Sequence, residues 1–199
     1  MSTYYFLSWK HKSQVASAIY EIEDQDSYAL LLALEGKQSL PFNFNLKRIK
    51  EVKDDIIVDD NLDELDEIWL DYQPNDFLWP LMSEKLKSVV QKNLTGNENV
   101  DWVDCKVRKG NEERIYYILR FNKVLDVLNI DETKFVNGTD YIIRPVFSFS
   151  KIKDYTVFVK PSFEDLWRIP SALYISEKLK KEIQKMKLTG LDFSKVTVI

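Results

Sequence analysis

Ten carboxylates lie between Asp54 and Asp76 with no Lys or Arg among them, and they are the first candidates for chemistry in this sequence. They are Asp54, Asp55, Asp59, Asp60, Asp63, Glu64, Asp66, Glu67, Asp71 and Asp76. Clustered carboxylates can act as a general acid and base, bind a hard cation, or attract a basic partner. Removing these ten from the 32 acidic residues leaves 22 against 28 basic residues, so a net charge of −4 becomes +6. The acidic character of the chain therefore resides in this one segment.

The residue types that most enzymes and metal sites require are scarce. The chain has one histidine, His11, which lies between two lysines and is expected on the surface, and one cysteine, Cys105, which is expected to be an inert thiol in a strand. This pair excludes a His/Cys metal cluster, and no nucleophile elbow or glycine-rich phosphate loop occurs. Residues 59–65 are rich in carboxylates but lack the turn glycine and the ligand spacing of a calcium loop. We therefore predict no enzymatic activity, no cofactor and no bound metal, with a carboxylate-based enzyme as a minor alternative.

Two interpretations of the acidic segment remain open. It can be a solvated face that keeps a lysine-rich protein soluble, or a docking surface that speeds encounter with a basic partner. For the second interpretation, the candidate partner-binding residues are Asp59, Asp60, Asp63, Glu64, Asp66 and Glu67. The lysines between Lys178 and Lys187 are expected to form a solvated helix face, so we predict no binding to nucleic acid.

An internal repeat is the most specific feature of the rest of the chain. Residues 83–96 and 176–190 agree at ten of the fourteen positions of the first copy once one residue is inserted. Ser83 and Ser176 are expected to cap two helices, because a serine oxygen can accept a free backbone N–H of the first turn. Each serine is followed by a glutamate, which the helix dipole favours at that end. The repeat therefore predicts two related, capped helices packed on one sheet.

Each predicted helix carries an apolar stripe and ends near a glycine. The stripes are Leu86, Val89 and Val90 in the first copy and Leu179, Ile183 and Met186 in the second. Gly96 and Gly190 are expected to terminate the helices in the left-handed conformation. The predicted core comprises Leu86, Val90, Tyr117, Leu119, Phe121, Val157, Leu179 and Ile183.

Strand patterns surround the repeat. Residues 105–107 and 114–121 flank Lys109-Gly110-Asn111 and predict a hairpin. Residues 141–149 and 155–160 are also expected to be strands, the first at an edge or with a bulge because it contains Pro145. Asn137-Gly138 indicates a turn.

The N-terminal third is less regular. Residues 4–7 suit a strand, and Ile56–Val58 is expected to be a short buried strand. Leu62, Leu65 and Trp69 are spaced as on a short acidic helix. Residues 27–34 fit a strand or a helix, because a short apolar run does not distinguish them.

These observations predict a single α+β domain over residues 1–199, with an antiparallel-rich mixed sheet and the two related helices packed against it. The chain shows no signal-peptide pattern, and its longest apolar run, residues 28–34, is too short to span a bilayer. We therefore expect a cytoplasmic protein that does not bind membranes and whose function is to bind another protein.

The repeat and its surroundings resemble a family of bacterial immunity proteins encoded beside polymorphic toxins. The resemblance covers about residues 70–199 and rests on the order and spacing of short motifs. These are Asp76-Phe77, residues 81–86, Tyr116-Tyr117-Ile118-Leu119, residues 124–128, Val157-Phe158-Val159, residues 174–179 and residues 188–193. It implies a protein that binds a cognate toxin domain and neutralises it without catalysis, and the expected toxin surface is basic. The alternative is a binding or regulatory module with another protein target.

Overall fold

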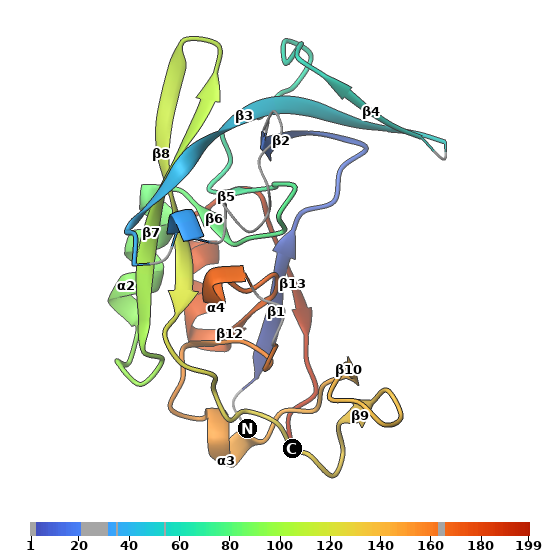
Figure 1. The fold of residues 1–199 in the computed structure, drawn as a ribbon, viewed down its shortest axis with the longest axis vertical. Helices are drawn as coiled ribbons and strands as arrows, with labels where there is room; N and C mark the ends of the chain where they lie inside the picture. Colours follow the sequence, from blue (N-terminus) through green and yellow to red (C-terminus); the bar gives the residue numbers. More distant parts are fainter. Residues whose placement is uncertain (1–2, 21–31, 35, 54, 163–165) are drawn as a thin grey trace.

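The computed structural model describes residues 3–20, 32–34, 36–53, 55–162 and 166–199, and it has an α+β fold rich in strands (Figure 1). A four-stranded antiparallel sheet has the order β11 (Val157–Phe158), β12 (Leu173–Ser176), β1 (Tyr4–Trp9) and β13 (Leu191–Lys195). A seven-stranded sheet has the order β2 (Gln14–Tyr20), β3 (Ser39–Val52), β7 (Val100–Lys109), β8 (Glu112–Phe121), β6 (Leu81–Met82) and β5 (Tyr72–Gln73), with β4 (Asp55–Asp59) also paired to β3. Only β3 and β7 are parallel among the described ladders, so the predicted class is confirmed, but the expected single sheet is two sheets.

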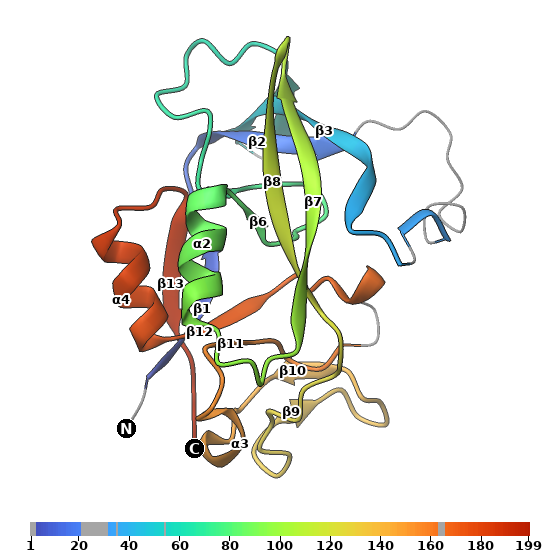
Figure 2. The same cartoon turned by 90° about the vertical axis from the view of Figure 1, so that its left-hand side faces the viewer.

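The helices and the smallest sheet complete the described fold. They are α2 (Glu84–Asn93), α3 (Phe149–Ile152), α4 (Glu177–Lys185), the 3₁₀ turn η1 (Leu166–Arg168), and the pair β9 (Lys134–Phe135) and β10 (Ile142–Arg144). Helix α2 packs on β6 and β8 of the larger sheet, and α4 packs on β1 and β12 of the smaller one. The two helices also contact each other and lie side by side in Figure 2. One large apolar cluster, which includes the buried stripes of both helices, joins the two sheets.

The sequence repeat corresponds to two units of the same topology. In the first, strands β5 and β6 lead into α2 and then into β7, and the sheet order is β5, β6, β8, β7. In the second, β11 and β12 lead into α4 and then into β13, and the sheet order is β11, β12, β1, β13. Strand β1 therefore takes the place in the second unit that β8 takes in the first. β1 is antiparallel to β12 and β13, and β8 is antiparallel to the corresponding strands β6 and β7. The N-terminal strand completes a unit whose other elements come from the C-terminal part.

Reciprocal hydrogen bonds connect the two units. The cap residue Ser83 donates its N–H to the carbonyl of Asp71, and Ser176 donates its N–H to the carbonyl of Thr156. The Asp71 carboxylate accepts from the N–H of Thr189 at 2.9 Å, in the turn after α4. The N–H of Thr156 donates at 2.8 Å to Glu98, in the turn after α2. Asp71, which pairs with the cap of α2, is thus bonded to the turn after α4. Thr156, which pairs with the cap of α4, is bonded to the turn after α2.

Both predicted helix caps are confirmed, because the hydroxyls of Ser83 and Ser176 accept from the N–H three residues later at 3.3 Å. Leu86, Val90, Leu179 and Ile183 are buried as expected. The predicted glycine stops are wrong in position, because α2 ends at Asn93 and α4 at Lys185, before either glycine. Both glycines do have a positive φ, +91° at Gly96 and +82° at Gly190, but after α4 the first residue with a positive φ is Lys187, at +52°.

One residue assigned to an apolar stripe, Met186, and one assigned to the core, Tyr117, lie elsewhere. Met186 lies beyond the end of α4 and is 55% exposed, so it is not part of the apolar stripe. Tyr117 is only half-buried, because its ring lies beside the charged first turns of α2, where the Lys87 ammonium is 3.5 Å from the ring centroid. A hydrogen bond with Glu84, together with partial burial, raises the pKa of Tyr117 to about 12. Leu119, Phe121 and Val157 are buried as predicted.

The hairpin formed by β7 and β8 is confirmed, with Gly110 in its turn at φ +54°. The other two predicted strands are shorter than expected. Only Ile142–Arg144 forms a strand in the first, paired with β9 alone, and Phe149 already begins α3. In the second, only Val157–Phe158 is a strand. The turn at Asn137-Gly138 is confirmed by a φ of +76° at the glycine.

In the N-terminal third, the strand at residues 4–7 is confirmed within β1. Ile56–Val58 is a strand, β4, but the prediction that it is buried is wrong. The acidic helix expected around Leu62–Trp69 is also wrong, because this stretch is a loop that folds back over β2 and β3. The undecided apolar run at residues 27–34 lies mostly outside the described residues.

Candidate interaction surface

The acidic loop, residues 59–67, leaves the end of β4 and lies against basic side chains of β3 and of the segment just before β2. Arg48 on β3 is the centre of these contacts, with a side chain only 11% exposed. Its guanidinium donates to Asp59 at 2.5 Å and also to Glu64. The backbone N–H of Asn61 and the Arg48 guanidinium lower the pKa of Asp59. The sequence separates Arg48 from this loop by the whole β4 hairpin, and the antiparallel register brings Arg48 opposite Asp59.

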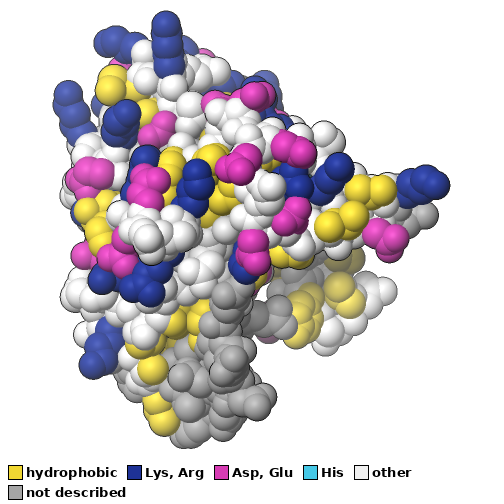
Figure 3. Space-filling model, turned by 90° about the horizontal axis from the view of Figure 1, so that it is seen from above, with side chains coloured by type: hydrophobic (Ala, Val, Ile, Leu, Met, Phe, Trp, Pro, Cys, Tyr) yellow, Lys and Arg dark blue, Asp and Glu magenta, His cyan; other side chains and the backbone are white. Residues whose placement is uncertain are grey.

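Two further carboxylates of the loop form ion pairs, and two do not. Lys47 pairs with Asp60, and Lys12 donates to Glu67 at 2.6 Å. Asp63 and Asp66 are exposed and form no ion pair with another described residue. Four of the six candidate partner-binding residues are therefore paired within the chain. Figure 3 shows Asp and Glu side chains interspersed with Lys and Arg on this face rather than a uniformly acidic area.

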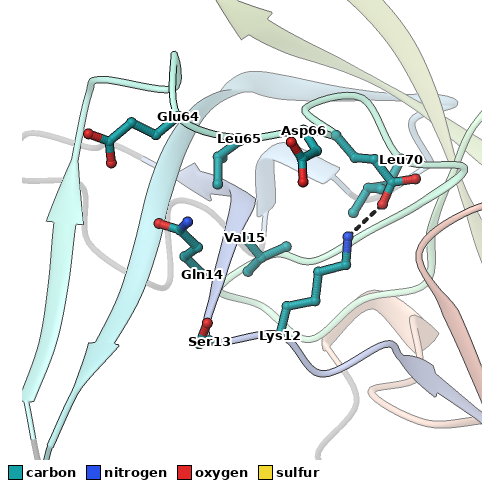
Figure 4. Close-up of a pocket in the computed structure, with 9 residues that line it drawn as sticks. Lys12, Ser13, Gln14, Val15, Glu64, Leu65, Asp66 and Leu70 are labelled. Atoms are coloured by element: carbon teal, nitrogen blue, oxygen red, sulfur yellow. Dashed lines mark hydrogen bonds and ion pairs between the residues drawn. The ribbon is translucent and has the colours of Figure 1, made fainter.

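A cleft of about 360 Å³ lies between the acidic loop and the start of β2. It is lined by Lys12, Ser13, Gln14, Val15, Glu64, Leu65, Asp66, Glu67 and Leu70. Figure 4 shows the Lys12 side chain crossing the cleft to its ion pair. In the described part of the chain, no group of three or more His, Cys, Asp or Glu side chains is placed to hold a metal ion. The cleft thus offers charged and hydrogen-bonding groups for a surface contact.

Strand β4, next to the acidic loop, carries an apolar surface that faces solvent. Ile56, Ile57 and Val58 are 70%, 48% and 55% exposed. Successive residues of a strand point to opposite faces, so this hairpin is unpacked on both faces. Figures 1 and 3 show it projecting from the body of the molecule. Large exposed apolar residues grouped on a charged surface are typical of a binding site.

Outside this surface, the two residues with the most reactive side chains lie in different environments. Cys105 is buried in the apolar cluster of the larger sheet, and burial raises the pKa of its thiol. His11 is on the surface as predicted, 3.8 Å from the Glu51 carboxylate. A buried thiol and an exposed imidazole cannot form a nucleophile and base pair.

The immunity protein family (Imm11) has a family model that matches residues 7–198. The match covers nearly the whole chain, from the second half of β1 through β2 and the β3–β4 hairpin to β13. This chain belongs to the Imm11 family of immunity proteins. Among curated proteins none matches it. The helices that the structure describes lack the length and apolar character needed to cross a membrane.

The exposed apolar residues of β4 are the part of this Imm11 surface that sequence reasoning missed. The run Ile56-Ile57-Val58 has the composition of a buried strand, and burial was predicted on that basis. A signal was present in the charges on both sides, because Lys53, Asp55, Asp59 and Asp60 closely bracket the run. Charged residues so close to an apolar run of three residues leave little room for it to enter a core.

Proposed function

We propose that this Imm11 protein binds a cognate bacterial toxin domain and neutralises it by occupying its surface, without catalysis. The observation that carries the proposal is the membership of an immunity protein family. A protein that confers immunity must stop a toxin, and direct binding requires only a complementary surface. The burial of Cys105 and the surface position of His11 give no support to a covalent mechanism.

The β3–β4 hairpin and the acidic loop are proposed as the contact surface. The hairpin supplies Ile56, Ile57 and Val58, and the loop supplies the candidate residues Asp59, Asp60, Asp63, Glu64, Asp66 and Glu67. Within this set, Asp63 and Asp66 are the best placed to meet basic groups of a partner, because the other four are in ion pairs. Exposed carboxylates without an internal partner raise the association rate with a basic surface.

The proposal is tested with the purified chain and the purified toxin domain encoded beside it. Toxin activity titrated with the chain should fall to zero at a fixed stoichiometric ratio, and calorimetry should give the same ratio for binding. The toxin should recover its activity after the complex is dissociated and the chain removed. Inactivation by substoichiometric amounts of chain, or a toxin that remains inactive after separation, would contradict neutralisation by binding alone.

The role of the acidic loop has its own test. In the variant Asp63→Asn/Asp66→Asn two negative charges are lost without breaking any ion pair among the described residues. We expect slower association with the toxin and a shallower dependence of the rate on salt, with an unchanged dissociation rate. The matched control is Asp131→Asn/Glu132→Gln, which removes the same charge from two exposed residues before β9. Equal association rates for the two variants would show that only net charge matters and that the loop is a solvated face.

A further inference from the structure

The outer edge of β4 has no partner strand among the described residues. The ladder that the structure describes for it is antiparallel with β3, from Arg48↔Asp59 to Val52↔Asp55. Strand β2 pairs with the opposite edge of β3, over Gln14↔Lys50 to Tyr20↔Phe44. Within the described part of the chain, the sheet therefore stops at β4 on this side, and no described strand pairs with the backbone groups on the far side of β4. Such an edge is a template for pairing with another extended chain.

The register identifies which backbone groups are turned outward. Two residues connect Val52 to Asp55, and the closing pair of a two-residue hairpin is hydrogen-bonded. Antiparallel pairs alternate between hydrogen-bonded and non-hydrogen-bonded, so Glu51↔Ile56 and Ile49↔Val58 are non-hydrogen-bonded pairs. The N–H and C=O groups of Ile56 and Val58 consequently point away from β3, toward the unpaired edge.

The side chains of β4 are as exposed as its edge. A hairpin of two strands is at best marginally stable in water without packing on one face, and in this one Ile56, Ile57 and Val58 are each about half exposed or more. An added strand would cover apolar surface and satisfy the outward amides together. A partner that contacted only the side chains on one face of β4 would instead leave the outer edge of the strand and its other face in water.

We infer that β4 binds an extended segment of the toxin domain as an additional strand, continuing the larger sheet beyond its present edge. This inference rests on the proposed function and specifies how the complex is held. Main-chain hydrogen bonds would supply affinity, and alternate side chains of the segment would supply specificity. The segment is one with apolar residues opposite Ile56–Val58 and Lys or Arg toward its ends. That chemistry follows from Asp55 before the apolar run and Asp63 after it, both exposed and without an ion pair among the described residues.

Residue-resolved amide hydrogen exchange tests the inference directly. The chain is labelled with ¹⁵N, and exchange is followed by NMR with and without the catalytically inactivated toxin domain. Strand addition predicts that the amides of Ile56 and Val58 exchange freely in the chain alone and become protected in the complex. The amide of Ile57, which faces β3, is the internal reference for hairpin integrity.

A pair of variants at one position separates backbone pairing from side-chain contact. Val58→Pro removes the outward N–H and leaves the β3 ladder, whereas Val58→Thr keeps the N–H and the branched shape. We expect Val58→Pro to weaken toxin binding by about tenfold or more and Val58→Thr by clearly less. Val136→Thr/Ile143→Thr, in the small β9–β10 sheet and the loop beside it, is the control for exposed apolar residues elsewhere. The denaturation midpoint of each variant without toxin shows whether a loss of toxin binding arises at the hairpin or from a less stable fold.

Each alternative has its own signature. If the complex forms by calorimetry but Ile56 and Val58 stay unprotected, strand addition is wrong and the proposed function stands. If the two amides are already protected in the chain alone and sedimentation shows a dimer, the added strand is a second copy and the inference about the toxin is wrong. If no complex forms, the proposed function and the inference fall together.

Discussion

The carboxylate of Asp71 accepts a hydrogen bond from the backbone N–H of Thr189 at 2.9 Å, across 118 residues of sequence. The same carboxylate accepts from the hydroxyl of Ser83, the cap of α2, at 2.6 Å. One side chain thus connects the start of the first repeat helix to the turn that follows the second. Glu98 is its counterpart, because it accepts from Thr95, Gly96 and Thr156 and is fully buried. The two repeat units are joined by these two carboxylates as well as by their apolar faces.

Replacing either linking carboxylate should therefore destabilise the fold. Asp71→Ala and Glu98→Ala should each lower the free energy of unfolding by about 2–3 kcal/mol, since several donors lose a charged acceptor. Asp66→Ala, on the exposed loop, is the matched control and should change it by less than about 0.5 kcal/mol. Urea denaturation measures all three. A carboxylate variant as stable as the Asp66 variant would show that apolar packing alone joins the units.

Gly190 should not tolerate a side chain. Its φ is +82°, and a Cβ atom would lie 2.4 Å from the backbone carbonyl oxygen of Tyr72. Gly190→Ala should cost about 2 kcal/mol or more, because a backbone collision adds to the left-handed conformation. Gly138→Ala is the control, since its φ is +76° but no atom lies within 4 Å of the added Cβ. Similar denaturation midpoints for the two variants would mean that the approach of the chain at Tyr72 is not tight.

The apolar stripes of the repeat helices should be structural. Leu86→Ala and Leu179→Ala each remove a fully buried side chain and should cost about 2–5 kcal/mol. Met186→Ala serves as the control, because Met186 is exposed and its loss should cost less than about 0.5 kcal/mol. Thermal and urea denaturation should find both leucine variants less stable than the Met186 variant. An unchanged midpoint for either leucine variant would contradict its burial.

The ion pairs of Arg48 should stabilise the acidic loop at neutral pH and lose this effect in acid. Asp59 has a lowered pKa in the folded chain, so its contribution is present above the unfolded pKa, near 4, and is lost as the pH falls through the folded value. Asp59→Asn/Glu64→Gln should lower the denaturation midpoint at pH 7 and flatten its decline between about pH 5 and pH 2. Asp63→Asn/Asp66→Asn, which breaks no described ion pair, should leave the midpoint nearly unchanged. Identical pH profiles for the two variants would show that the Arg48 contacts do not contribute to stability.

Local signals in the sequence determined the elements whose formation depends on neighbouring residues. The serine caps, the first turns of α2 and α4 and the β7–β8 hairpin were predictable, because a cap bonds within three residues and a hairpin turn within four. The repeat also predicted two related helices. What it could not show is that β1, at the opposite end of the chain, completes the second unit, because strand pairing over such a separation leaves no periodicity in the sequence.

Burial and charge pairing were decided by the tertiary structure. Ile56–Val58 has the composition of a core strand, yet β4 projects beyond the core and is exposed, because β3 is longer than the apolar cluster beneath it. Ten clustered carboxylates predict an acidic surface, yet part of it is neutralised by Arg48 and Lys47 of β3 and by Lys12, which lies between β1 and β2. Composition alone determines how many apolar and charged groups a segment contains. Which of them meet solvent and which meet each other depends on contacts between distant segments, and these exist only in the folded chain.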